Sequence, residues 1–360
     1  MKTRFPIVKP VLPKLNNYLK YVEGVFDRNW LTNNGPLVQE LESRLAEYLQ
    51  VRNLMLVSNG TLALHLAYKA LDLTGQVITT PFSFAATASS LCWEKLTPNF
   101  VDIEQGTFNL DHRLLESHKS AEAIVAVHVF GNPCRVEAIE EFAQRNNQTV
   151  IYDAAHAFGV QYKNRSLLSF GDASTLSLHA TKLFHCVEGG AVIFKDKEKL
   201  QLAKQKINFG FDSNNIPVTL GINAKMSEMH AAMGLTMLDM VDDILSHRQA
   251  LVAEYFSLLN NIVEFQIWQE QSANNGAYMP VLFESESQLL KVVDSLMQQG
   301  IQTRRYFYPC LSELPVYGLR GDTPVSEGIS RRILCLPLYF DLSLSDVALI
   351  CHAVKIAMIK

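Results

Sequence analysis

The chain has 360 residues, of which 48% are hydrophobic and 9% aromatic, and its 32 basic and 36 acidic residues give a formal net charge of −4. This hydrophobic content is ordinary for a packed globular protein and excludes a disordered chain, and the length suits one large and one smaller domain. Because the charges are interspersed and form no basic block, we expect neither nucleic acid nor an anionic membrane as a partner.

The amino terminus and the cysteines both indicate a reducing compartment. Residues 1–15 contain three prolines and no apolar run of signal-peptide length. No segment reaches the ~18 uncharged apolar residues that a membrane span requires. The six cysteines lie far apart and form no CxxC pair, which is typical of free thiols. We therefore expect a cytoplasmic protein.

Short β-rich runs alternate with helix-capable stretches over the first two thirds of the chain. A turn-like TNNGP at residues 32–36 leads into a predicted helix over 36–49. The pattern then predicts strands at 53–58, 76–81, 98–103, 123–131, 149–155, 173–178 and 190–194, with helix-capable stretches at 61–73, 85–95, 110–118 and 136–146. Such alternation predicts an α/β fold whose mostly parallel sheet is covered on both faces.

The last third of the chain follows a different pattern. A long helical stretch over 225–259 contains Gly234 as its only breaker, and it suits a bridge between two domains. The pattern then predicts a strand at 277–284, a helix at 287–300, a strand at 333–340 and a terminal helix over 346–359. We expect a large domain over residues 1–240, including an amino-terminal arm, and a smaller α+β domain over 241–360.

Residues 58–61, Ser-Asn-Gly-Thr, lie between a predicted strand and a predicted helix. Unpaired N–H groups at a helix start, with small hydroxyl side chains beside them, can cradle a phosphate group. The alternative is an ordinary helix cap, which is the commoner use of such residues. No GxGxxG fingerprint follows the first predicted strand, and this argues against a nicotinamide-binding domain.

Asp153 closes a predicted strand and is followed by the small residues Ala154 and Ala155, then by His156. An acid at the carboxyl end of a parallel strand faces the crevice where ligands bind in such sheets. A strand-end cap or a solvated turn is the alternative. Beside a pyridine nitrogen, the carboxylate would keep that nitrogen protonated, so that the ring could withdraw electrons from an adjacent carbanion.

Lys182 is the only formally charged residue between Ala173 and Val187, histidines apart. Most lysines are exposed and inert, but this one lies in an apolar, hydroxyl-bearing segment between two predicted strands. Partial desolvation there would lower the pKa of its amine and supply the neutral form for imine formation. The neighbouring residues His179, His185 and Cys186 fit no standard zinc spacing, so we expect no metal site.

The chain carries a phosphate cradle, then a strand-end acid, then an isolated lysine. With these features in this order it resembles the fold-type I pyridoxal-phosphate enzymes, and more narrowly the DegT/StrS-type sugar aminotransferases. The resemblance extends over nearly the whole chain, through WLTNNGP, SNGTLALHLA, TTPFSFAAT, VHVFGNPC, YDAAHAFG, SLHATKLFHCVEGG, GINAKMSEMHAAMG, TRRYFYPCL and ILCLPLYF. The segments around Asp153 and Lys182 are the most specific. The resemblance implies pyridoxal 5′-phosphate as the cofactor, a large domain that binds it, and a homodimer with shared active sites.

The resemblance also implies a role for each matching residue. Lys182 is the catalytic residue, which holds the cofactor covalently and then moves a proton between substrate and cofactor carbons. Asp153 pairs with the pyridine nitrogen, and His156 contacts the phenolic oxygen. The other implied cofactor-binding residues are Phe84 and Ala155 on the two ring faces, Gly60, Thr61 and Ser177 at the phosphate, and Asn223, which reaches the phosphate of the other subunit's site.

The sequence departs from the family pattern at Lys225, where many relatives have arginine. Lysine lacks the bidentate fork of arginine, so a carboxylate-binding role does not carry over unchanged. The combination of HATK, VEGG and WLTNNGP is most similar to members that aminate carbon 4 of a dTDP-linked 4-keto-6-deoxyglucose, with glutamate as the donor. Candidates for contacts with the nucleotide sugar are then Thr32, Asn33, Asn34 and Tyr306. A plain turn and a core aromatic are the alternatives.

The resemblance thus predicts a transferase that makes dTDP-4-amino-4,6-dideoxyglucose for deoxysugar and cell-surface polysaccharide (lipopolysaccharide O-antigen) biosynthesis. A 3-keto-sugar aminotransferase is the nearest alternative, because it would need the same catalytic residues. A pyridoxamine-dependent dehydratase of this fold has histidine in place of the lysine, so Lys182 argues against it. A non-catalytic regulator would have a degraded site, whereas the chemistry-bearing positions here are intact.

Overall fold

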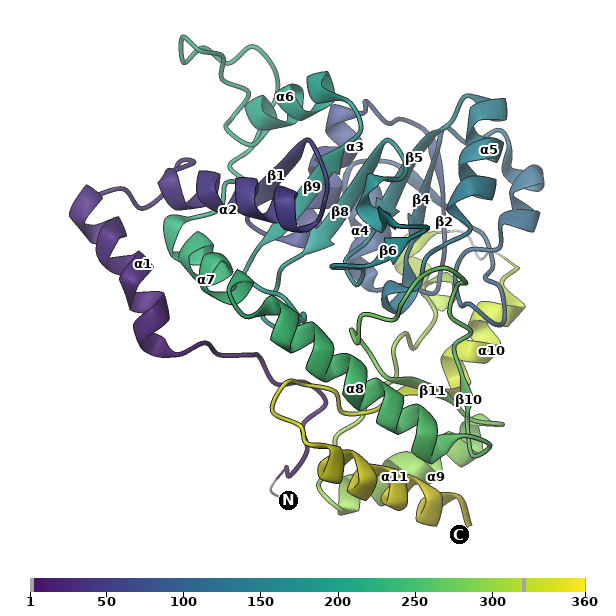
Figure 1. The fold of residues 1–360 in the computed structure, drawn as a ribbon. Helices are drawn as coiled ribbons and strands as arrows, with labels where there is room; N and C mark the ends of the chain where they lie inside the picture. Colours follow the sequence, from purple (N-terminus) through teal and green to yellow (C-terminus); the bar gives the residue numbers. More distant parts are fainter. Residues whose placement is uncertain (1–2, 319–321, 360) are drawn as a thin grey trace.

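A seven-stranded sheet lies at the centre of the larger half of the molecule (Figure 1). The computed structural model describes residues 3–318 and 322–359. In spatial order the strands are β1 Leu54–Val57, β9 Gly190–Phe194, β8 Ala173–Ser177, β5 Thr149–Asp153, β4 Ala123–Val127, β2 Gln76–Thr79 and β3 Thr97–Phe100. Neighbouring strands are parallel except that β9 runs antiparallel to β1 and β8. The predicted α/β fold with a mostly parallel sheet is confirmed.

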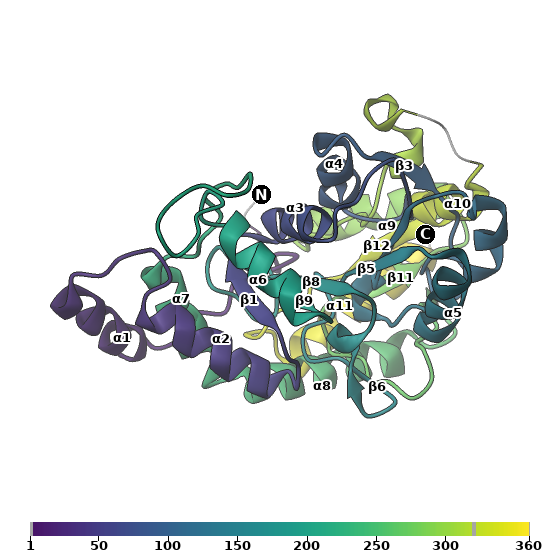
Figure 2. The same cartoon turned by 90° about the horizontal axis from the view of Figure 1, so that it is seen from above.

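Helices cover both faces of this sheet (Figure 2). Successive side chains of a strand point to opposite faces, and accordingly Leu54 and Leu56 of β1 belong to one apolar cluster while Met55 and Val57 belong to another. The helices that contribute most of the first cluster are α2 Pro36–Tyr48, α5 Val136–Asn146 and α7 Glu228–Leu238. Those of the second are α3 Gly60–Ala70, α4 Ala85–Trp93 and α6 Lys197–Lys206.

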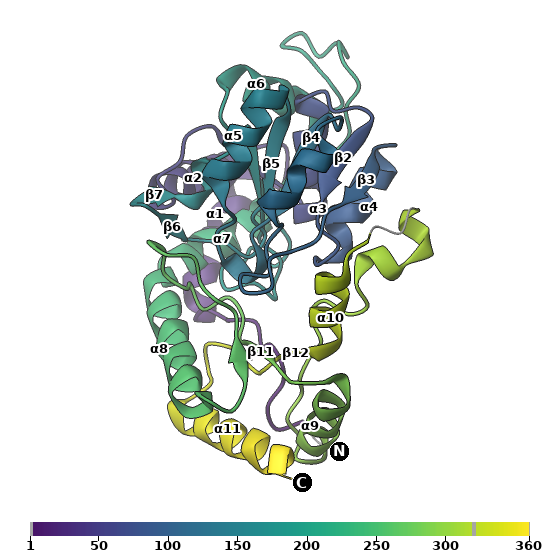
Figure 3. The same ribbon diagram turned by 90° about the vertical axis from the view of Figure 1, so that its right-hand side faces the viewer.

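The smaller half is built on a three-stranded antiparallel sheet with its own apolar cluster (Figure 3). Its strands are β10 Glu264–Phe265, β11 Pro280–Leu282 and β12 Ile333–Cys335, and its helices are α8 Val241–Leu259, α9 Glu286–Gln298, α10 Pro324–Arg332 and α11 Leu344–Ile359. Phe5 pairs with Ile301 and packs in this same cluster. The division near residue 240 stays a prediction. The separate cluster supports it, although the chain start contacts the smaller half.

The predicted single helix over 225–259 is wrong in one respect, because it is two helices, α7 and α8, separated at Asp239 and Met240. Met240 leaves the helical region with φ −125° and ψ 8°. Asp242 and Asp243 lie in the first turn of α8, where acidic side chains favour a new helix start. Likewise, the stretch predicted as helical over 110–118 forms the short 3₁₀ helix His112–His118.

The TNNGP turn ends where α2 begins, and the start of α2 packs against Glu228 of α7. The backbone N–H groups of Leu37 and Val38 each donate to the buried carboxylate of Glu228 at 3.0 Å. This carboxylate therefore caps the start of α2 and complements its dipole. A Cβ atom on Gly35 would lie 2.5 Å from Cδ of Glu228, so only glycine lets the two helices approach this closely.

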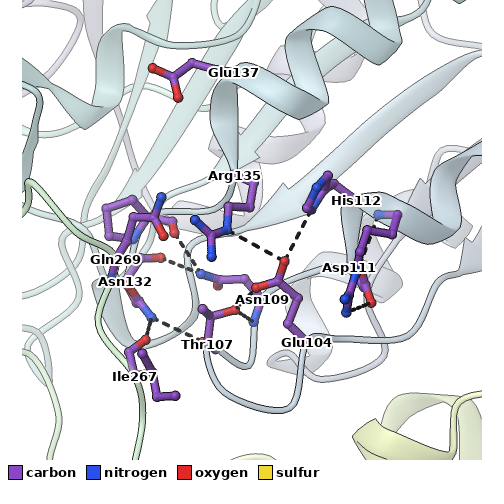
Figure 4. Close-up of polar contacts among 12 residues, drawn as sticks. Glu104, Thr107, Asn109, Asp111, His112, Asn132, Arg135, Glu137, Ile267 and Gln269 are labelled. Atoms are coloured by element: carbon purple, nitrogen blue, oxygen red, sulfur yellow. Dashed lines mark hydrogen bonds and ion pairs between the residues drawn. The ribbon is translucent and has the colours of Figure 1, made fainter.

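A polar network joins the loop after β4 to both halves of the molecule (Figure 4). The side chain of Asn132 donates to the Ile267 carbonyl at 3.0 Å and accepts from the Gln269 N–H at 2.8 Å. Next to it, Glu104 faces His112 at 3.2 Å and Arg135 at 3.8 Å. These contacts hold the loop that carries Phe130, which is buried and packs against His156.

The six cysteines are free, as expected, and five of them are buried. Among residues 3–318 and 322–359, no helix has the length and apolar character needed to cross a membrane.

Candidate active site

A cavity of about 760 Å³ opens at the carboxyl ends of the parallel strands. Its walls combine the residues that follow β1, β2, β5 and β8 with a segment of the smaller half around Tyr278 and Tyr306. Open α/β sheets bind ligands in this crevice. The predicted site residues that line the cavity are Gly60, Thr61, Phe84, Asp153, Ala155, His156, Ser177, Lys182 and Tyr306.

Lys182 reaches the cavity from the turn between β8 and β9. Its Nζ donates to the Tyr278 Oη at 3.3 Å. Burial lowers the pKa of the Lys182 amine from its ordinary 10.5 to about 8, against the raising effects of Asp153 and Tyr306. Removal from water disfavours the ammonium form, so a substantial fraction of the amine is neutral at mildly alkaline pH.

Asp153 is the last residue of β5, and two donors hold its carboxylate. Thr87 Oγ1 donates to Oδ2 at 2.7 Å, and the backbone N–H of Ala155 donates to Oδ1 at 3.1 Å. Burial raises the pKa of Asp153, while these two donors and Lys182 lower it. The carboxylate is therefore fixed in orientation inside the cavity wall.

His156 presents a neutral ring with a defined tautomer. The backbone N–H of Phe130 donates to Nδ1 at 3.2 Å, which leaves the proton on Nε2 as a donor. Burial, and then the charge of Lys182, lower the pKa of His156 well below its ordinary value. Its ring lies between aromatic neighbours, 4.6 Å from Tyr278 and 6.0 Å from Phe307 between centroids.

The start of α3 lies against the end of β8. Asn59 caps this helix, its Oδ1 accepting from the Leu62 N–H at 2.9 Å. A Cβ atom on Gly60 would lie 2.9 Å from the Ser177 Cβ, and one on Gly190 would lie 2.5 Å from the Asn59 carbonyl carbon. Two glycines thus bring the helix start close to the Ser177 hydroxyl. The first N–H groups of a helix lack intrahelical partners and attract anions.

Four predicted residues do not line this cavity. Thr32, Asn33 and Asn34 are exposed between α1 Leu15–Arg28 and α2. Asn223 is exposed before α7, where its backbone forms a bridge with Asn208. Lys225 donates to Asn208 Oδ1 at 2.9 Å. None of these side chains reaches the Lys182 site of its own chain.

Several residues in and beside the site were not predicted, among them Thr87, Tyr278 and Arg304. Thr87 binds Asp153 from α4, and Tyr278 and Arg304 line the cavity from the smaller half. Each contact joins segments far apart in the chain, and no local pattern signals it. Thr87 lies in the same TTPFSFAAT segment as the predicted residue Phe84, and it is Thr87 that makes the buried contact with Asp153.

One group of possible metal ligands lies outside the cavity. Ligand atoms of Glu104, Asp111 and His112 lie within 4.8 Å of one another. Glu104 faces Arg135, and Asp111 is paired with Arg113 at 2.7 Å. The arginines already neutralise both carboxylates, which lowers the attraction for a cation.

Comparisons with known proteins identify similar aminotransferases over nearly the whole chain. Residues 14–355 match the DegT/DnrJ/EryC1/StrS aminotransferase family. The chain is 42% identical over 351 residues to the dTDP-4-amino-4,6-dideoxy-D-glucose transaminase of Shigella dysenteriae, covering 95% of each chain. It is 38% identical over 351 residues to the Escherichia coli protein of the same name, covering 94% of each. The crystal structure of DesI in the presence of its TDP-sugar product has a TM-score of 0.93 at 32% identity, covering 99% of this chain and 94% of DesI.

Proposed function

The chain belongs to the DegT/DnrJ/EryC1/StrS aminotransferase family, and on this premise we propose that it moves an amino group from glutamate to carbon 4 of dTDP-4-keto-6-deoxyglucose. It is a pyridoxal-phosphate-dependent sugar aminotransferase. The product would be dTDP-4-amino-4,6-dideoxyglucose, the sugar for which both transaminases above are named.

The walls of the cavity fit pyridoxal phosphate at each of its polar groups. The N–H groups at the start of α3, with Thr61 and Ser177, would hold the phosphate. Asp153 would pair with the ring nitrogen, and the Nε2–H of His156 would donate to the phenolic oxygen. Phe84 and Ala155 lie on the same cavity wall and would cover the ring faces. When bound, the cofactor withdraws electrons from the carbon that carries the transferred nitrogen.

The observation that carries the proposal is the Lys182 amine, held in one cavity with a buried carboxylate and a helix start. Near its pKa of about 8, this amine is present in both protonation states. Its Nζ can therefore accept a proton from one carbon and return it to another, which is the general acid–base step of amino transfer. Asp153 would supply the negative charge that keeps a proton on the ring nitrogen.

Arg304 would receive the anionic part of the substrates. It is an exposed residue on the cavity wall, with its guanidinium carbon 4.6 Å from the centre of the Tyr306 ring. Glutamate and a nucleoside-diphosphate sugar are both anions, and a guanidinium binds carboxylate or phosphate through paired hydrogen bonds. Tyr306 would then lie against the sugar or the nucleotide.

We propose a homodimer whose subunits complete each other's sites. Apolar side chains are exposed along α1 and the loop before α7, with Leu15 66%, Phe26 65% and Leu220 91% exposed. Such a surface is typical of an interaction site. In the dimer, Asn223 would reach the phosphate of the other subunit's site. Contact of residues 32–34 with the nucleotide sugar is part of the same proposal.

The proposed setting is the cytoplasm, because all six thiols are free and free thiols persist in reducing compartments. The aminated sugar would serve deoxysugar biosynthesis for cell-surface polysaccharide, including lipopolysaccharide O-antigen. A 3-keto-sugar aminotransferase would use the same residues, but both relatives above are named for a 4-amino sugar. A non-catalytic regulator is not favoured, because nine predicted site residues line one cavity.

An amination assay over dTDP-, UDP- and GDP-linked keto sugars tests the proposal, with products read by mass spectrometry and NMR. We expect turnover with dTDP-4-keto-6-deoxyglucose and glutamate, an amine at carbon 4, and a 2-oxoglutarate coproduct. The Lys182→Ala chain is the matched negative control. Amination at carbon 3, or turnover only with another nucleotide, would contradict the proposed substrate while leaving the transaminase chemistry intact.

A further inference from the structure

Tyr278 contacts the amine of Lys182 from the other half of the molecule. Lys182 follows β8 in the larger half, whereas Tyr278 precedes β11 in the smaller half. Besides the hydrogen bond at 3.3 Å, Nζ lies 5.7 Å from the centre of the phenol ring. The ring packs against His156 at 4.6 Å and Phe130 at 5.3 Å between centroids. Aromatic neighbours therefore fix the ring, and its hydroxyl lies at the reacting nitrogen.

A buried arginine holds the backbone just before Tyr278. Arg248 of α8 is 4% exposed. Its Nε donates to the Gly276 carbonyl at 2.7 Å, and its Nη2 donates to the Ala277 carbonyl at 2.9 Å. In the described part of the chain it forms no ion pair with a carboxylate, and burial lowers its pKa to about 10. A buried charge is costly unless hydrogen bonds satisfy it, so these two carbonyls are the partners that keep Arg248 in place.

Two asparagines fix the same turn from its other side. Asn274 Oδ1 accepts from the Gly276 N–H at 2.8 Å, and Asn275 Oδ1 accepts from the Ala277 N–H at 3.0 Å. Asn275 Nδ2 also donates to the His156 carbonyl at 2.9 Å. Gly276 has a φ of +71°, and a Cβ atom there would lie 2.7 Å from the Arg248 Cβ, so glycine is required. The turn thus connects α8, the loop after β5 and Tyr278.

We propose that Tyr278 is a positioning residue whose hydroxyl orients the Lys182 amine, and that Arg248 sets the place of Tyr278 through the carbonyls of residues 276 and 277. The inference rests on the proposed role of Lys182. A phenol suits this task because it accepts a hydrogen bond from an ammonium and donates one to a neutral amine. Burial raises the pKa of Tyr278, which keeps the hydroxyl proton available in both states.

Tyr278→Phe and Arg248→Lys test this chain of contacts. The first variant removes only the hydroxyl, and the second keeps a charge but loses the fork that reaches both carbonyls. Tyr255→Phe is the matched control, because it removes another buried hydroxyl, one that donates to the Pro337 carbonyl at 2.8 Å away from the cavity wall. Cofactor-free chains are mixed with pyridoxal phosphate and reduced with borohydride at set times. The label on the Lys182 peptide is quantified by mass spectrometry, alongside kcat, KM and Tm.

We expect Tyr278→Phe to slow labelling of Lys182, and to lower kcat, about tenfold, in line with the loss of one hydrogen bond to a chargeable group. The KM of each substrate should stay within about twofold, because the hydroxyl acts on the lysine rather than on binding. Arg248→Lys should give a smaller loss of the same kind. Tyr255→Phe should label at the wild-type rate even if its Tm falls.

Wild-type labelling and turnover by a folded Tyr278→Phe chain would overturn the inference, and so would a loss in Arg248→Lys that Tyr278→Phe does not share. If Arg248→Lys does not fold, the Tyr278→Phe rates decide. An unlabelled Lys182 in the wild-type chain is a separate failure, because it contradicts the proposed function itself.

Discussion

Lys182 and Asp153 share one cavity, and burial acts on them in opposite directions. It lowers the pKa of the Lys182 amine to about 8 and raises the pKa of the Asp153 carboxyl. Both shifts disfavour the charged form. Perturbed groups of this kind gather at active sites, where their reactivity outweighs their cost to folding.

The stability of the cofactor-free chain should therefore depend on pH through Lys182. The pKa of this amine is about 8 in the folded chain and 10.5 ordinarily. Between these values the unfolded chain binds more protons than the folded chain, so the free energy of unfolding rises with pH. The cost of burying the charged Lys182 amine is fully present below pH 8. At pH 7, Lys182→Met should raise the free energy of unfolding by about 1–2 kcal/mol, less than the full shift implies, because Asp153 loses a favourable partner.

Urea unfolding of both cofactor-free chains at pH 7 and near pH 10.5 measures this difference. The gain should shrink toward zero at the higher pH, where the amine of the folded wild type is already neutral and the unfolded chain is losing the same proton. Lys291→Met, on the exposed face of α9, should show no such trend. A gain of equal size at both pH values would assign the effect to packing instead of charge.

At the residue scale, sequence patterns identified side chains whose chemistry stands out locally. Lys182 is isolated among apolar neighbours, and Asp153 closes a strand, so both were predicted. Tyr278 and Arg248 were not, because a tyrosine before a strand and an arginine on a helix are ordinary locally. Their proposed roles depend on tertiary contacts. Tyr278 contacts Lys182, and Arg248 contacts the carbonyls of residues 276 and 277.

At the scale of elements, the close approach of α3 to β8 forms the proposed phosphate cradle. Gly60→Ala should disturb it, because the new Cβ would lie 2.9 Å from the Ser177 Cβ and must push the helix start away. We expect the Kd for pyridoxal phosphate to rise roughly 10- to 100-fold, corresponding to about 1–3 kcal/mol. Alanine favours helix over glycine, so the fold itself should be retained.

Titration of the cofactor-free chain with pyridoxal phosphate, followed by absorbance, gives this Kd. Gly328→Ala is the matched control, since it lies in α10 and its added Cβ would meet no atom within 4 Å. That variant should bind as the wild type does. Unchanged affinity in Gly60→Ala would place the phosphate elsewhere.

The sheet was more predictable than the helices. All seven predicted strands of the large sheet form. Continuous apolar runs such as those of β1, β4 and β9 suit strands that are buried on both faces. The helices α1, α6 and α10 were missed. In α6, only Leu200 and Ala203 of its ten residues are buried, so it carries little apolar periodicity. The break between α7 and α8 was missed as well, because no glycine or proline marks it.

At the scale of the whole molecule, the exposed apolar surface lies near the predicted site residues that do not line the cavity. The residues predicted to bind ligands but found outside the cavity, 32–34 and Asn223, flank α1 and α7. A local sequence pattern can indicate that such residues bind a ligand. It cannot indicate whether they serve the site of their own subunit or that of a partner subunit. A closed two-fold dimer would use each such surface twice and bring both copies to a site.

Mixing two inactive variants decides between a shared and a self-contained site. Lys182→Ala removes the amine, and Asn223→Asp places a negative charge where the proposal has a phosphate contact, so each homodimer should be inactive. In a mixed dimer, one site keeps its own Lys182 and receives the intact Asn223 of the partner subunit. Random reassembly after mild denaturation should then restore roughly one quarter of wild-type activity. Mixed dimers seen by native mass spectrometry without recovered activity would mean that Asn223 serves its own chain, and full activity of Asn223→Asp alone would remove this residue from the site.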